Sequence, residues 1–189
     1  MNRIQRTLGI AGLAMLISTQ GEAAFIRVCQ RTAPVKAFLE EILKKDCAAI
    51  SAADLLTVKR VAVDDGTIHA FQADDFSGLT NLEILNIRSN PYTELPEGLL
   101  TELVNLKTLV IISTTLRHYP DDFLQFNPNI ENLHLFRNKV RSISESVLTR
   151  LEHATKLQVM DFDDELGDAE KTRLRRAFPE NGSVSLSFF

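Results

Sequence analysis

The sequence predicts an α/β solenoid in which about six short parallel strands line the concave face. The first observation is a sequence pattern that recurs every 24 residues, beginning at Leu82, at Leu106 and at Ile130. Self-similarity at a period of this size indicates stacked units that bury their apolar residues against one another. The other two observations are a helical pattern between two cysteines before the repeats and a helix-strand pattern after them. These flanking patterns predict a cap at each end.

Residues 1–23 have the composition of a signal peptide. Arg3 and Arg6 form a basic start, residues 8–17 are apolar or small, and small residues occupy positions 21 and 23. This order is typical of export signals, and an apolar run of about ten residues is too short to span a bilayer. A buried N-terminal helix is the alternative. We expect the mature chain, which has no segment able to span a membrane, to be secreted or periplasmic.

Residues 24–57 are predicted to form the N-terminal cap. Thr32 suits the N-cap position of a helix, and Pro34 suits its first turn. Ser51 and Asp54 have the spacing of a capping box and predict a second short helix. The apolar residues of the first helix follow helical spacing at Val35, Phe38, Leu39, Ile42 and Leu43.

Cys29 and Cys47 flank this first helix and are the two cysteines of the sequence. In an exported chain such a pair is most simply interpreted as a disulfide. The alternatives are a zinc site, which needs further ligands in close spacing, and a catalytic thiol, which needs a histidine partner. Neither set of companions lies near the two cysteines, so we predict the disulfide.

Residues 58–166 contain the repeats. The clearest unit is Leu82-x-x-Leu85-x-Ile87-x-x-Asn90, in which apolar residues at alternate positions predict a short strand. The same pattern fits at four further places, which begin at Val58, Leu106, Ile130 and Leu157. Together with a last strand near position 185, these units predict six parallel strands centred near positions 62, 86, 110, 134, 161 and 185.

Residues 167–189 are predicted to close the solenoid with a helix and a strand. Residues 168–178 have a helical pattern with an apolar side. In the strand that follows, Val184 and Leu186 lie one period after Met160 and Phe162. We therefore expect Val184 and Leu186 to point into the core opposite those two residues.

The repeating unit resembles the leucine-rich repeat, and in detail the typical 24-residue class L-x-x-L-x-L-x-x-N-x-L-x-x-L-P-x-x-x-F-x-x-L. Residues 90–103 fit the second half of this consensus, and cysteine-flanked N-terminal caps are common in its secreted members. The resemblance implies that the Asn side chain after each strand lies inside the turn. It also implies a binding surface rather than a catalytic centre. Five residues occupy the Asn position, and Glu165 fits it poorly: Gly66, Asn90, Thr114, Asn138 and Glu165.

The residues between the inward positions are expected to face the concave side. They place aliphatic and aromatic side chains at the centre of this face, arginines beside them and acidic residues towards one end. An apolar centre with a charged rim is the usual anatomy of a protein-binding patch. Incidental exposure of apolar residues is the alternative. The predicted binding residues are Arg88, Val110, Ile112, His134, Phe136, Arg137, Asp161 and Asp163.

Other classes of function are disfavoured. A net charge of −4 without a basic stripe is unlike a nucleic-acid-binding protein. The acidic run from Asp161 to Glu165 lacks the glycine turn of a calcium loop, and the sequence has no phosphate loop or nucleophile elbow. We therefore expect no metal, no cofactor and no enzymatic activity. The sequence predicts an exported module that binds a protein or peptide; the alternative is a structural or self-associating envelope protein without a discrete ligand.

Overall fold

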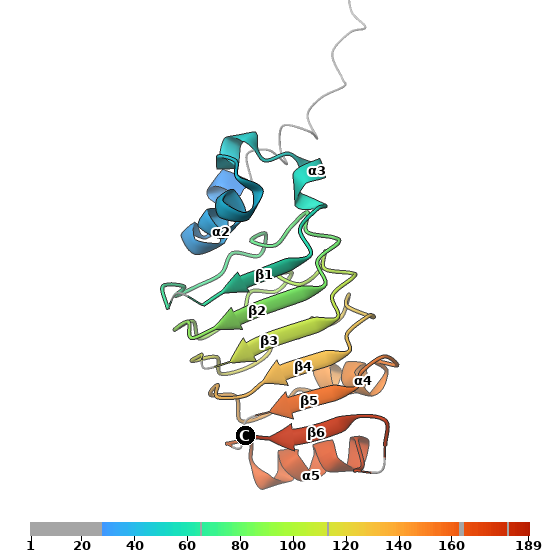
Figure 1. The fold of residues 1–189 in the computed structure, drawn as a ribbon. Coiled ribbons are helices and arrows are strands. Elements are labelled where there is room, and N and C mark those ends of the chain that lie inside the picture. Colours follow the sequence, from blue (N-terminus) through green and yellow to red (C-terminus); the bar gives the residue numbers. More distant parts are fainter. Residues whose placement is uncertain (1–27, 65, 113, 163–164, 181) are drawn as a thin grey trace, which may run out of the picture.

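The computed structural model describes residues 28–189 except 65, 113, 163, 164 and 181. The predicted signal peptide, the first residues of the predicted cap and Asp163 therefore lie outside the described residues. The described chain contains a six-stranded parallel sheet whose strands follow sequence order (Figure 1). This arrangement confirms the predicted α/β solenoid. The strands are β1 Arg60–Val63, β2 Ile84–Arg88, β3 Thr108–Ile112, β4 Asn132–Leu135, β5 Val159–Phe162 and β6 Ser185–Phe188.

The register of the sheet follows the sequence repeat through β5. Leu85 pairs with Leu109, and Leu109 pairs with Leu133. Leu133 in turn pairs with Met160 of β5. The residues that the repeat aligns in sequence are thus direct neighbours across the strands.

The prediction for the last strand is wrong by two residues. We expected Val184 and Leu186 to lie opposite Met160 and Phe162, but the sheet pairs Leu186 with Met160 and Phe188 with Phe162. A slip of two residues keeps every side chain on its predicted face of the sheet, because side chains alternate with a period of two. It nevertheless moves each residue of β6 along the strand by two positions.

Backbone hydrogen bonds fix this register. The N–H of Ser185 donates to the Gln158 carbonyl at 2.7 Å, and the N–H of Phe189 donates to the Phe162 carbonyl at 3.0 Å. The connection from β5 to β6, which contains α5, is two residues longer than a strict period provides. The period of the sequence therefore fails where a helix-containing turn replaces the compact turns of the earlier units.

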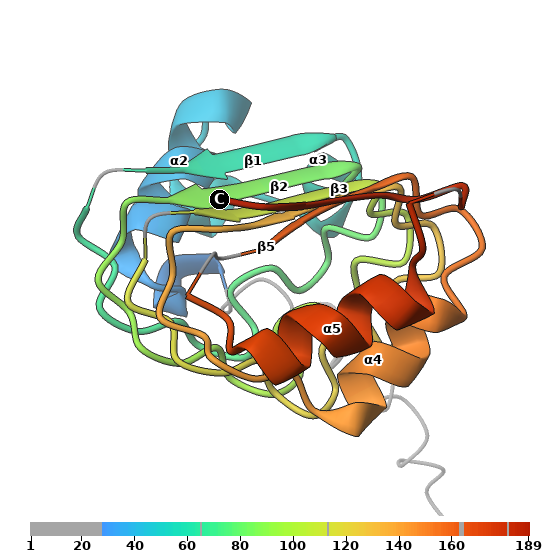
Figure 2. The same ribbon diagram turned by 90° about the horizontal axis from the view of Figure 1, so that it is seen from below.

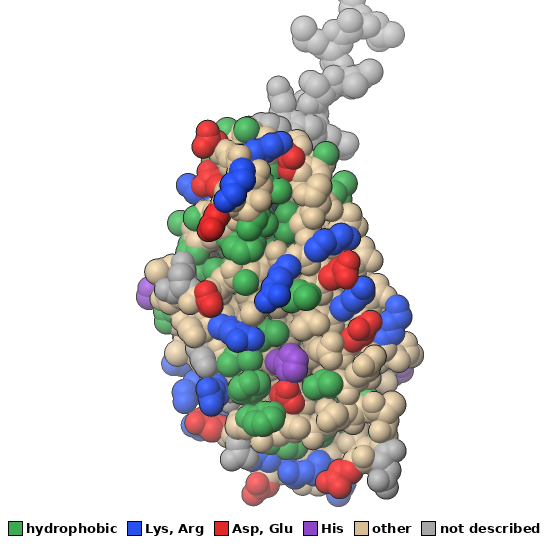
Figure 3. All heavy atoms as spheres, in the orientation of Figure 1, with side chains coloured by type: hydrophobic (Ala, Val, Ile, Leu, Met, Phe, Trp, Pro, Cys, Tyr) green, Lys and Arg blue, Asp and Glu red, His purple; other side chains and the backbone are tan. Residues whose placement is uncertain are grey.

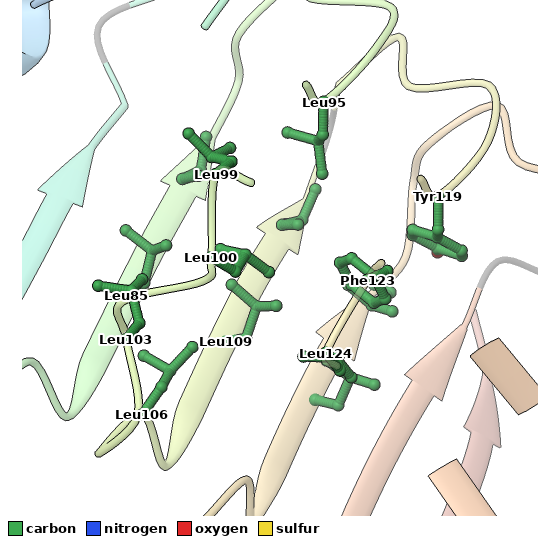
Figure 4. Packing of buried hydrophobic residues seen from close by; sticks show 14 of the residues in the cluster. Leu85, Leu95, Leu99, Leu100, Leu103, Leu106, Leu109, Tyr119, Phe123 and Leu124 are labelled. Atoms are coloured by element: carbon green, nitrogen blue, oxygen red, sulfur yellow. The ribbon is translucent and has the colours of Figure 1, made fainter. Parts of the chain in front are cut away.

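The apolar core lies behind the sheet. Leu85, Leu109 and Leu133 form one continuous inward ladder, and each is 0% exposed. Figure 4 shows Leu99, Leu100 and other leucines of the returning turns packed against Leu85 and Leu109. Each unit covers the core of the next, which is why the repeats form a single cluster of buried side chains.

The Asn position lies inside the turns, as the resemblance implies. The side chain of Asn90 accepts from the Ile68 N–H at 3.1 Å and donates to the Val63 and Arg88 carbonyls at 3.0 and 2.6 Å. Asn138 accepts from the hydroxyl of Thr114 at 2.6 Å, so threonine replaces asparagine here without leaving a gap in the ladder. These bonds satisfy buried backbone groups that the bend leaves unpaired.

The N-terminal end is covered by a helical cap. It consists of α2 (Ala33–Leu43), the 3₁₀ turn η1 (Cys47–Ala49) and α3 (Ala52–Leu55). A Cys29–Cys47 disulfide joins its two sides, which confirms that prediction. Ser51 and Asp54 form the predicted capping box of α3, whereas the Thr32 hydroxyl at the start of α2 bonds the buried Asp75 at 2.5 Å instead of capping its own helix.

Returning segments cover the opposite side of the core from the sheet. They include two helices, α4 (Glu145–Glu152) and α5 (Asp168–Ala177), which lie beside one another near the C-terminal end (Figure 2). The helix predicted over residues 168–178 is therefore present. Within the described residues, no helix has the length and apolar character that crossing a membrane requires.

Candidate functional site

The face of the sheet that points away from the core, called the open face below, carries the predicted binding residues that the structure describes. Inward residues such as Leu109 and Ile111 are buried, and the residues between them project from the other side of the sheet. Figure 3 shows this face with hydrophobic side chains gathered near its lower end and charged side chains around them. Helices α4 and α5 lie on the far side of the core (Figure 2).

An aromatic pair forms the most accessible apolar part of the open face. The rings of Phe136 and Phe189 lie with their centroids 5.1 Å apart and their planes tilted by 44°. Phe189 is 60% exposed, and Phe136 is partly exposed. They meet because Phe189 directly follows β6, on the same side of the sheet as Phe136 after β4. We call Ile112, Phe136 and Phe189 the apolar cluster.

Val110 supports this region without offering much contact area. It projects from the open face between Asn86 and His134, its partners on the neighbouring strands. Its side chain is only 6% exposed, although it is not part of the core cluster behind the sheet. Val110 itself therefore offers little area to a partner, which would touch the more exposed residues around it first.

Two arginines border the apolar cluster. The guanidinium of Arg88 donates through Nε to the Asn86 side chain at 2.8 Å, which holds it along the sheet. The Arg137 guanidinium carbon lies 6.0 Å from the centre of the Phe136 ring, at the outer limit of a cation–π contact. Both side chains are exposed. They give the rim of the cluster positive charge that remains accessible to a partner.

His134 and Asp161 form a cross-strand pair beside the cluster. They are register neighbours on β4 and β5, and His134 Nδ1 lies 2.5 Å from Asp161 Oδ2. Their side chains are 29% and 13% exposed. Asp161 is therefore engaged by His134 rather than free to hold a ligand, so one carboxylate of the acidic end expected from the sequence already has a partner within the sheet.

The chain is similar to a leucine-rich repeat protein from Leptospira interrogans, with a TM-score of 0.62 and 21% identity over 79% of this chain and 39% of that chain. The fold is that of leucine-rich repeat proteins. The chain is also similar to an internalin from Listeria monocytogenes, with a TM-score of 0.49 and 17% identity over 82% of this chain and 55% of that chain.

These likenesses are structural and partial. No protein-family model matches the sequence, and no curated protein matches it. The chain spans about two-fifths of the length of the Leptospira interrogans protein, at 39%. The comparison therefore establishes the leucine-rich repeat fold, and any partner has to be argued from this chain's own surface.

The leucine-rich repeat sheet brings together most of the predicted binding residues and adds one that the sequence reasoning missed. The expected pairing of Val184 with Met160 would place Ser187 in the same row across the sheet as Ile112 and Phe136, whereas the observed register places Ser187 beside Asp161. Phe189 takes the place expected of Ser187 and touches Phe136. The paired aromatic residues at positions 188 and 189 were a signal for this, because one must face the open side if the other faces the core.

The leucine-rich repeat chain holds no obvious centre for metal chemistry in the ranges that the structure describes. No group of three or more His, Cys, Asp or Glu side chains is placed to hold an ion there. The exposed Glu165, at the poorly fitting Asn position, lies 3.4 Å from Lys139. The open face therefore offers an apolar contact area, cationic groups at its rim and the His134–Asp161 pair, which are groups able to contact another molecule.

Proposed function

We propose that this chain is an exported leucine-rich repeat module that binds a protein or peptide through the open face of its sheet. The observation that carries the proposal is the apolar cluster of Ile112, Phe136 and Phe189 beside the exposed Arg88 and Arg137. Aromatic residues and arginine are enriched among the residues that dominate protein–protein binding energy. Exposed apolar patches rimmed by polar residues are typical of interaction surfaces.

The dimensions of the open face suit one modest partner. Six strands at about 4.8 Å spacing span roughly 25 Å across the sheet. A standard interface buries about 800 Å² on each side, which a face of this width can supply. Six of the seven predicted residues that the structure describes, together with Phe189, would form its centre and rim; the seventh, Val110, is only 6% exposed. Those six residues are Arg88, Ile112, His134, Phe136, Arg137 and Asp161.

Export is supported by the sequence of residues 1–23 and by the cysteine pair. The Cys29–Cys47 disulfide lies in the cap beside the first repeat, and disulfides persist in oxidising compartments. We therefore propose that residues 1–23 are a cleaved signal peptide and that the mature module is secreted or periplasmic. A cysteine-clamped cap of this kind agrees with the secreted 24-residue class that the repeats resemble.

Substitution of the aromatic anchor tests the proposal. Partners captured from the extracellular or periplasmic fraction by the wild-type protein would be identified, and the affinity of one of them measured by calorimetry. Truncation of a central aromatic anchor costs about 2 kcal/mol, so we expect Phe136→Ala to weaken binding by roughly 30-fold. Ser185→Ala, an exposed position on the same sheet, serves as the control and should leave the affinity within about twofold.

Two results would contradict the proposal. The first is unchanged affinity in Phe136→Ala together with loss of binding when residues on the helical side are changed. The second is a molar mass in light scattering that rises with protein concentration and falls back to one chain in Phe136→Ala. That second result would indicate self-association, the alternative function expected from the sequence. A retained circular dichroism spectrum in Phe136→Ala is required for either interpretation.

A further inference from the structure

The two ends of the sheet are built differently. At the first end α2 covers β1, and Val61 and Val63 are 0% and 4% exposed. At the other end β6 is the outermost strand, and its inward residues Leu186 and Phe188 are only partly buried. Figure 2, which views the molecule from this end, shows β6 with no other segment of the chain drawn over it.

The outer side of β6 presents free backbone groups. Ser185 and Phe189 donate towards β5, so the alternation of a parallel strand turns the N–H and C=O of Leu186 and Phe188 outwards. Among the described residues, no strand pairs with this side. Exposed edges are usually protected by charged residues, proline or a bulge. The β6 strand contains neither a charged residue nor a proline. Its edge is therefore competent to accept another strand.

Positive charge flanks this edge on the helical side. The Arg175 guanidinium carbon lies 4.9 Å from the centre of the Phe188 ring, and Lys171 Nζ lies 5.8 Å from it. Arg175 and Arg176 are exposed, and neither makes an ion pair within the described part of the chain. Figure 3 shows Lys and Arg side chains in the middle of the lower end of the molecule, with acidic side chains towards its two sides.

We propose that the β6 edge binds an extended acidic segment of another protein as a seventh strand of the sheet. Side chains of such a strand alternate between the two faces. Those on the helical side would lie beside Phe188 and within reach of Arg175, which favours carboxylates. Those on the open side would lie beside the exposed Phe189, which favours apolar residues. Backbone hydrogen bonds supply the affinity in this mode, and the alternate side chains supply the specificity.

The test uses the mature protein and two synthetic peptides of about six residues, the usual length of a strand. In one peptide glutamate alternates with valine, and in the other lysine alternates with valine. Binding of each fluorescein-labelled peptide is measured by anisotropy. We expect the glutamate peptide to bind at least about tenfold more tightly than the lysine peptide, and its affinity to fall as salt is added.

Two pairs of variants separate the backbone contribution from the charge contribution. Leu186→Pro removes an outward N–H while leaving the bonds to β5, whereas Leu186→Ala loses the side chain and keeps the N–H. Arg175→Glu reverses charge beside the edge, and Arg141→Glu reverses an exposed charge outside α5 and β6. We expect Leu186→Pro and Arg175→Glu each to weaken the glutamate peptide about tenfold, and the two controls to stay within about threefold.

Several results would overturn the inference. These are equal binding of the two peptides, no binding of either, or Leu186→Pro that binds as well as Leu186→Ala. A two-chain mass in light scattering that Leu186→Pro restores to one chain would show that a second copy occupies the edge. Phe136→Ala distinguishes this site from the open face, because it leaves the outward groups of β6 in place and should keep peptide binding. Failure at the β6 edge therefore leaves the proposed function standing.

Discussion

The asparagine inside the second turn offers the sharpest test of how the repeats are held together. Asn90 is 1% exposed, and its side chain satisfies the buried Ile68 N–H and Val63 carbonyl as well as the Arg88 carbonyl. In Asn90→Ala the Ile68 N–H and the Val63 carbonyl lose this hydrogen-bond partner in the buried interior of the turn, which water does not reach. A buried polar group left unsatisfied costs about 1–3 kcal/mol, so we expect a total loss of about 3 kcal/mol. In a chain of this size this corresponds to a melting temperature lower by about 6–12 °C.

Asn105→Ala is the matched control. Asn105 is exposed, and its side chain donates through Nδ2 to the Thr80 carbonyl at 2.9 Å. Water can replace that bond, so the expected loss is below about 1 kcal/mol. Urea unfolding followed by circular dichroism measures both free energies of unfolding. Equal losses in the two variants, or an Asn90→Ala protein as stable as the wild type, would refute the reasoning from buried unsatisfied groups.

Three further predictions concern the stability of the core, the disulfide of the N-terminal cap and the loss of stability at low pH. Leu109→Ala should lower the free energy of unfolding by about 2–5 kcal/mol in urea titrations, because the residue is 0% exposed; an unchanged value would mean that the strand faces the other way. Cys29→Ala should lower the melting temperature, since closure of the loop to Cys47 contributes about 3 kcal/mol in the chain-entropy view; thiol labelling of the unreduced wild type should find no reactive cysteine. Hydrogen bonds from Lys45 and then Ser51 lower the pKa of Asp54, so its contribution to stability is present above the ordinary aspartate pKa of about 3.9 and is lost as the pH falls further. Melting curves of Asp54→Asn should accordingly lie below the wild type at pH 7 and approach it in strong acid.

Much of the fold was predictable because the interactions that create it are local or periodic. The spacing of Leu85, Leu109 and Leu133 predicted their pairing across the strands, since each unit can bury its apolar face only against an equivalent unit. The capping box at Ser51 was predictable for the same reason, because its partners lie three residues apart. The register of β6 was not predictable, because it depends on the length of the connection that contains α5, and that length departs from the repeat.

The sequence was enough to predict which residues of the candidate site face one side of the sheet. It was not enough to predict which of them are exposed or which side chains touch one another. The sequence by itself determined that Val110, His134 and Phe136 project from the same face, because alternation along a strand is a property of the backbone. Only the tertiary structure decided that Val110 is covered, that His134 contacts Asp161 and that Phe136 meets Phe189. Exposure and contact depend on which side chains lie on the neighbouring strands, and that is set by hydrogen-bonded register between residues far apart in the chain rather than by the pattern within any one unit.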